Sequence, residues 1–106
     1  MLFRSQLNVL ESTFAGEMTR IRELSEQAAV FEASGNLSKV VELLEAYRRI
    51  RETDEILVRL GDAYFGMRRL ADAERCDLRA SQIGSLTPAL EQRLRRLREA
   101  APRDRR

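Results

Sequence analysis

Side chains that commonly carry out acid–base or metal chemistry are scarce in this chain. It contains no histidine, so the commonest general base and the commonest metal ligand are both missing. Its single cysteine, Cys76, cannot form an internal disulfide, and no histidine is present to activate the thiol as a nucleophile. We therefore interpret Cys76 as a small apolar residue of a helix core.

Carboxylate pairs do occur, but at a spacing typical of helix surfaces. Glu42 and Glu45 lie about one turn apart in a helical pattern, where solvated charge is the expected role. The chain has neither a Cys-x-x-Cys pair nor a glycine-rich phosphate loop. We expect no catalytic residue, no metal and no cofactor, and hence a protein that is not an enzyme.

Positive charge is concentrated at the C-terminal end. Residues 92–106 hold seven Arg against one Glu and one Asp, a net charge of +5, whereas the whole chain carries +2. Clustered arginines can bind nucleic-acid phosphates. The candidates are Arg93, Arg95, Arg96 and Arg98. No aromatic residue lies among them to stack on bases, so we favour a solvated helix face and keep nucleic-acid association through this helix as the alternative.

The N-terminal residues show neither the long apolar stretch nor the small-residue cleavage site of a signal peptide. No stretch approaches the roughly 18 apolar residues of a membrane span. With a lone cysteine, this pattern predicts a cytoplasmic protein that does not enter the membrane.

Apolar residues recur at helical spacing along most of the chain, which predicts an all-α fold of about five helices. Gly35 can end the first helix and Asn36 can cap the second. Thr53 is a cap for the third, and Thr87 followed by Pro88 should open the fifth. The links are short, so successive helices should form antiparallel hairpins.

The first helical segment carries a heptad-like series of apolar residues over residues 3–31, interrupted at Glu17. Its N-terminal members are Phe3, Leu7, Leu10 and Phe14. Either this face packs on the domain's own core, or the first fifteen residues extend beyond it and self-associate with another chain. Gly16 leaves open whether the segment is one long helix or two.

One constant shift along the sequence superimposes similar residues of the two central segments. The matched pairs are Leu24 with Leu57, Ala28 with Gly61, Phe31 with Tyr64, Val40 with Ala73 and Tyr47 with Ala80. Glycine inside a helix costs roughly 1 kcal/mol against alanine. We therefore interpret Gly61 as a place where another helix must approach closely.

This repeat resembles the tetratricopeptide repeat (TPR), with its small residue, following aromatic and spaced alanines. The second copy carries the pattern as Leu57, Leu60, Gly61, Tyr64, Ala73 and Ala80. Gln27 departs from it in the first copy. In the second, Arg68 stands where the first has the turn glycine Gly35, and Asp77 stands where the family has a bulky apolar residue.

The resemblance covers residues 21–86, and it implies a division of the chain into four parts. The alternative to a repeat is a plain helical bundle in which the spacing is coincidental. The expected parts are an N-terminal helical extension (1–20), two TPR-like hairpins (21–86), a C-terminal capping helix (87–100) and a basic disordered tail (101–106).

The resemblance also implies a partner-binding groove lined by the first helix of each repeat. The groove residues would be Arg22, Ser25, Ala29, Glu32, Ala33, Glu55, Val58, Asp62, Phe65 and Gly66. Phe65 is either an aromatic anchor for the partner or is covered by a terminal helix. We expect a helix or peptide of another protein as the partner, in an adaptor, a chaperone or an assembly subunit. The family includes small bacterial secretion chaperones, and the size of this chain is compatible with that role.

Overall fold

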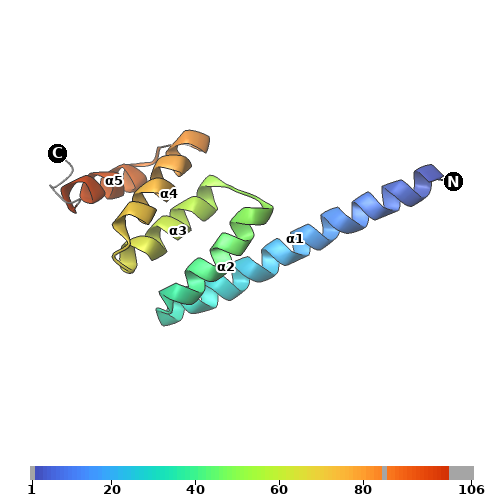
Figure 1. Cartoon of the computed structure of the whole chain (residues 1–106), viewed down its shortest axis with the longest axis horizontal. Helices are drawn as coiled ribbons and strands as arrows, with labels where there is room; N and C mark the ends of the chain where they lie inside the picture. The colour runs from blue at the N-terminus through green and yellow to red at the C-terminus, as the bar shows by residue number, and fades with distance from the viewer. Residues whose placement is uncertain (1, 85, 101–106) are drawn as a thin grey trace.

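The computed structural model describes residues 2–84 and 86–100, with side chains from residue 14 onward apart from residue 85. The helices are α1 (Leu2–Ser34), α2 (Leu37–Ile50), α3 (Asp54–Gly66), α4 (Leu70–Ile83) and α5 (Pro88–Ala100). Each helix packs on the next, so α1–α2 and α3–α4 form two hairpins and α5 lies against α4 at one end (Figure 1). The all-α hairpin architecture expected from the sequence is confirmed. The predicted tail, residues 101–106, lies outside the described residues.

Side-chain caps fix the starts of three helices. Asn36, Thr53 and Thr87 each accept a hydrogen bond from a backbone amide in the first turn of the following helix, at 3.3, 3.2 and 3.2 Å. Each cap satisfies one of the amides that a helix start leaves without a partner. Pro88 occupies the first position of α5, where its missing N–H is harmless. The predicted caps are confirmed.

The turns inside the two hairpins are built alike and occupy equivalent positions of the repeat. Gly35 has φ 80° and Arg68 has φ 64°, so both adopt the left-handed conformation. In each turn the next amide donates to a carbonyl in the last turn of the preceding helix. Asn36 donates to Phe31 at 3.0 Å, and Arg69 donates to Tyr64 at 2.9 Å. This is the hydrogen bond of a Schellman-type helix end. The second hairpin thus places an arginine where the geometry favours glycine.

Replacing Arg68 by glycine should raise the unfolding free energy by about 0.5–1 kcal/mol, because glycine adopts a positive φ without the Cβ penalty. Arg68 is exposed, so little packing is lost. The matched control, Gly35→Arg, should lower stability by about 1 kcal/mol for the same reason. Urea unfolding followed by circular dichroism measures both changes. A less stable Arg68→Gly variant would contradict the equivalence of the two turns.

The core runs along the row of helices and includes the matched residues of the repeat, buried or packed against it. Cys76 is buried there, as predicted. Ile83, which the helical pattern places on the inner face of residues 70–83, is instead 41% exposed, so that expectation is wrong. The physical reason is that α4 ends at this residue, and Gly84 rather than Ile83 lies against Asp54 at the start of α3.

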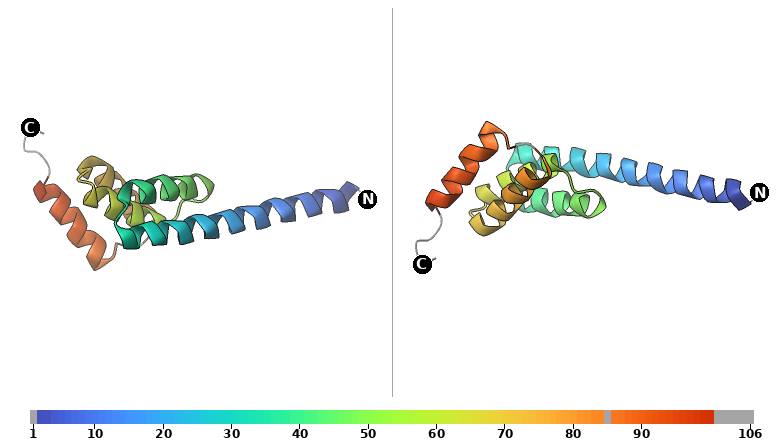
Figure 2. Two further views of the ribbon diagram at one scale, coloured as in Figure 1. Left: turned by 90° about the horizontal axis from the view of Figure 1, so that it is seen from below. Right: turned by 90° about the horizontal axis from the view of Figure 1, so that it is seen from above.

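Helix α1 is one continuous helix of 33 residues, which settles the question left open by Gly16. Its C-terminal half is buried against α2 at Ile21, Leu24 and Ala28. Its N-terminal half extends clear of the other helices in both views of Figure 2. Phe14 is 61% exposed there. The other members of the predicted self-association face, Phe3, Leu7 and Leu10, lie outside the residues whose side chains are described.

Candidate partner-binding face

The first helices of the two hairpins and the last helix are connected by two arginines in equivalent positions. Arg59 follows the Thr53 cap of α3 at the same distance along the chain as Arg93 follows the Thr87 cap of α5. Arg59 of α3 reaches back to α1, and Arg93 of α5 reaches back to α3. These contacts decide which parts of the predicted groove are open to a partner.

Arg59 crosses from α3 to α1. Its Nη2 lies 2.7 Å from Oε1 of Glu32, and its Nη1 donates to Oγ of Ser25 at 3.0 Å. Nη2 also donates to the backbone carbonyl of Ser25 at 3.4 Å. Ser25 and Glu32 are therefore already paired within the chain, and the arginine side chain spans the gap between the two helices.

Arg93 makes the corresponding contact from α5 to α3 and a second one to α4. Its Nη2 donates to the carbonyl of Val58 at 3.0 Å, and Val58 is the repeat equivalent of Ser25. Its Nε and Nη2 donate to the two carboxylate oxygens of Asp77, each at 2.7 Å, and its Nη1 is paired with Asp62. A bidentate pair of this kind is the strong form of an ion pair.

The interior position of this pair corrects one expectation from the sequence. The arginine pattern predicts a solvated face that includes Arg93, but its side chain is only 14% exposed and Asp77 is fully buried. Burial raises the pKa of the Asp77 carboxyl to about 7 and lowers the pKa of the Arg93 guanidinium. The two hydrogen bonds from the guanidinium favour the ionised carboxylate and oppose the effect of burial on Asp77.

The ion pair also accounts for Gly61. A Cβ atom added at Gly61 would fall on Oδ1 of Asp77 and come within 3.0 Å of Nη2 of Arg93. Asp77 is the repeat equivalent of Leu44, and both are fully buried. The second hairpin therefore replaces a buried leucine by a buried carboxylate, and the glycine makes room for it.

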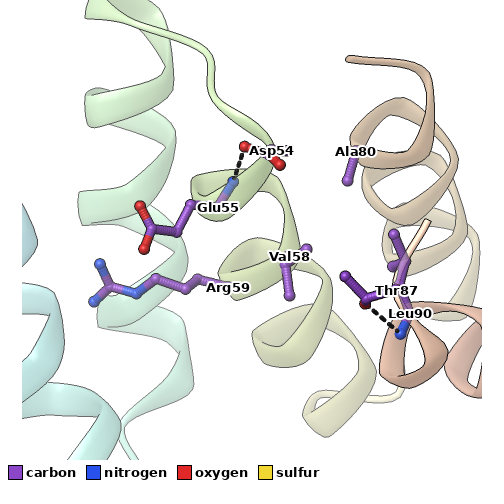
Figure 3. A pocket seen from close by; sticks show the side chains of 7 residues that line it. All are labelled: Asp54, Glu55, Val58, Arg59, Ala80, Thr87 and Leu90. Atoms are coloured by element: carbon purple, nitrogen blue, oxygen red, sulfur yellow. Dashed lines mark hydrogen bonds between the residues drawn. The ribbon is translucent and has the colours of Figure 1, made fainter. Parts of the chain in front are cut away.

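A cleft of about 510 Å³ opens between α3, the end of α4 and the start of α5. It is lined by Asp54, Glu55, Val58, Arg59, Ala80, Thr87 and Leu90. Val58 faces Thr87 and Leu90 across the gap, whereas Glu55 and Arg59 extend on the side of α3 away from α5 (Figure 3). The floor is apolar, and the exposed carboxylates of Asp54 and Glu55 lie at the start of α3.

The predicted groove residues fall into three groups. Ser25, Glu32 and Asp62 are engaged by the two arginines. Glu55 and Val58 line the cleft. Arg22, Ala29, Ala33 and Gly66 are exposed, and Phe65 is half-buried against the core. Their role in binding a partner stays a prediction.

Several residues of the site were not assigned to the groove from the sequence, namely Asp54, Arg59, Asp77, Ala80, Thr87, Leu90 and Arg93. The buried ion pair nevertheless has a detectable signal. Asp77 is a lone carboxylate at a position that the repeat fills with Leu44 in the first copy. Arg93 lies one turn from Leu90 and Leu97, on the apolar side of α5. A charge of each sign on a buried face predicts a pair.

The buried reactive groups are held in unreactive forms. Burial raises the pKa of the Cys76 thiol to about 11, so it is protonated at neutral pH. Burial, together with the hydrogen bond that its hydroxyl donates to Glu45 at 2.6 Å, also raises the pKa of Tyr64. Among residues 2–84 and 86–100, no cluster of three or more His, Cys, Asp or Glu could hold a metal ion.

Comparison with known proteins adds no assignment. No family model, no curated protein and no solved structure matches this chain. Within its described part, none of the helices combines the length and apolar character needed to cross a bilayer.

Proposed function

We propose that this chain is a non-catalytic, TPR-like protein-binding module of the cytoplasm, acting as an adaptor, chaperone or assembly subunit. The cleft between α3 and α5 is the observation that carries the proposal. It is bordered by two helices that Arg93 connects through the carbonyl of Val58, and this connection supports a preformed site. A preformed site lowers the ordering cost of binding.

The chemistry of the cleft indicates the kind of segment it would hold. Val58 lines the cleft as a partly exposed aliphatic side chain, and the buried Ala80 and Leu90 lie behind it. Asp54 and Glu55 place negative charge at the start of α3, with Glu55 on the side of α3 away from α5. A helix or extended peptide with an aliphatic anchor next to a lysine or arginine complements both features. Small bacterial secretion chaperones belong to the family that the repeat resembles, and the size of this chain is compatible with that role.

Selection of short random peptides on the full-length protein tests this proposal. We expect the selected peptides to combine a basic with an aliphatic residue. Glu55→Lys should weaken their binding about tenfold, because it turns an attraction into a repulsion. Val58→Ala should weaken it about fivefold by shrinking the apolar contact.

Glu26→Lys on α1 is the matched control, since it makes the same charge change at an exposed position outside the cleft. It should alter binding less than about twofold. Circular dichroism and melting curves establish that all three variants are folded. Peptides that bind Glu55→Lys and wild type equally well would place the binding site elsewhere.

Nucleic-acid association through α5 has less support. Arg93 is engaged within the chain, while Arg95, Arg96 and Arg98 are exposed. Titration with duplex DNA and single-stranded RNA at two salt concentrations separates the proposals. Steeply salt-dependent binding that is lost when these last three arginines are replaced by glutamine would favour the nucleic-acid role over the cleft.

A further inference from the structure

We propose that the projecting half of α1 pairs in antiparallel orientation with the same segment of a second copy, centred between residues 8 and 9. The proposal is independent of the cleft. Helix α1 is continuous from Leu2 to Ser34, and its first half lies clear of the other helices (Figures 1 and 2). Phe14 is a large apolar side chain left 61% exposed on that half.

The apolar positions of the projecting segment read the same in both directions. Phe3, Leu7, Leu10 and Phe14 are separated by steps of four, three and four. In an antiparallel pair, position 3 therefore lies opposite position 14 of the second copy, and position 7 lies opposite position 10. Phe then lies opposite Phe, and Leu lies opposite Leu. The alternating spacing of four and three is the heptad pattern of a short coiled coil.

Charges beside this seam favour the same orientation. Arg4 and Glu11 each directly follow a seam position and occupy equivalent heptad places. The antiparallel register sets position 4 of each chain near position 11 of the other, giving two opposite-charge pairs. A parallel register would set Glu17 of one copy against Glu17 of the other inside the seam, where like charges repel.

The folded body limits how far the pairing can extend. From Ile21 onward the same seam is covered by α2, with Ile21, Leu24 and Ala28 buried. Only the residues before Ile21 can therefore pair with a second copy. Antiparallel pairing puts the two bodies at opposite ends of the paired helices, whereas parallel pairing would bring them together beside Ile21.

Sedimentation equilibrium of the full chain is the first test, and it should show a reversible monomer–dimer equilibrium. Phe14→Ala should weaken dimerisation by about 30-fold or more, because each dimer loses two phenylalanine contacts. Val30→Ala is the matched control, since Val30 is 66% exposed on the same helix but lies outside the seam. A wild-type monomer at all concentrations up to about 1 mM would overturn the proposal.

Charge exchange tests the register. Arg4→Glu and Glu11→Arg should each weaken the dimer by about tenfold, because each turns two attractive pairs into repulsive ones. The double variant restores both pairs with reversed sign and should regain near wild-type affinity. Positions 4 and 11 are about two helical turns apart, so no contact within one helix explains such a rescue. A double variant as weak as the two single changes combined would overturn the register.

The orientation is measured with a nitroxide label on Arg22→Cys, an exposed position, in a Cys76→Ala background. The helical rise of about 1.5 Å per residue predicts about 40 Å between the two labels in the antiparallel dimer. A parallel dimer would bring them within about 20 Å of each other. Electron–electron double resonance covers both distances, and the shorter one would refute the antiparallel arrangement.

Discussion

At a pH high enough to ionise Asp77, Arg93→Met is expected to lower the unfolding free energy by about 3–5 kcal/mol, the usual effect of leaving a buried charge without its partner, and by less where Asp77 is protonated. Asp77 is fully buried, and both of its carboxylate oxygens accept hydrogen bonds from Arg93. A domain of this size is stable by only about 5–15 kcal/mol. The variant should therefore unfold at a much lower urea concentration than the wild type.

The dependence of this loss on pH identifies Asp77 as its cause. Burial raises the pKa of Asp77 to about 7, above the ordinary value of 3.8. The protonated form thus contributes stability that is complete below the unfolded-state pKa and is lost as the pH rises through about 7. Removing Arg93 takes away the hydrogen bonds that favour the ionised form, so the pKa rises further. Arg93→Met should melt at a higher temperature at about pH 5 than at about pH 8.

The control for this prediction is the double variant Asp77→Leu/Arg93→Met. It gives the second hairpin the leucine that the first has at Leu44. Replacing a buried ion pair by apolar residues of similar volume is often neutral or stabilising, so we expect stability within about 1 kcal/mol of wild type or above it. The double variant should also lack the added pH dependence of Arg93→Met. Equal losses in the single and double variants would show that packing by Arg93, not the charge of Asp77, is what matters.

Gly61→Leu is expected to lower the unfolding free energy by about 3 kcal/mol or more through overpacking. Even Gly61→Ala should be destabilising by about 1–3 kcal/mol, although alanine is the better helix former. Its methyl group would displace the Asp77 carboxylate from its position beside Arg93. Thermal and urea unfolding of both variants measure the effect.

A double-mutant cycle separates this clash from a general effect on α3. In the Asp77→Leu/Arg93→Met background, position 61 corresponds to Ala28 and position 77 to Leu44 of the first hairpin. Gly61→Ala should therefore be neutral or stabilising there, because alanine next to leucine is already accommodated in the equivalent place. If Gly61→Ala lowers the unfolding free energy equally in both backgrounds, the ion pair does not explain why position 61 is glycine.

The local features of the fold could be predicted because they depend on neighbouring residues. The caps at Asn36, Thr53 and Thr87 lie within one turn of the amides they bind, so the helix starts follow from the sequence alone. The constant offset between the two copies can be read from the spacing of residues in the sequence. The equivalent hydrogen bonds of the two hairpin turns are separated by the same offset. The buried stripes of the helices followed from the same periodicity, with Ile83 as the exception.

The contacts that define the candidate site could not be predicted because they join distant helices through long side chains. Arg59 reaches Ser25 and Glu32 of α1, so polar residues that were expected to face a partner are engaged within the chain. The spacing of Arg93 from Leu90 and Leu97 places it on the apolar side of α5, but only the packing of α5 on α4 brings it to Asp77. Residue spacing alone also gave no sign that the cleft lies between α3 and α5.

The continuity of α1 ties the projecting segment to the folding of the first hairpin. The first turn of a helix fixes several residues for a single hydrogen bond, and short isolated helices in water are marginal for that reason. Here the buried turns around Leu24 serve as the nucleus, so each further residue toward the N-terminus adds only a propagation step. Fraying should therefore begin at the N-terminal end of α1. If the first hairpin unfolds, the projecting half of α1 should lose its helical structure together with it.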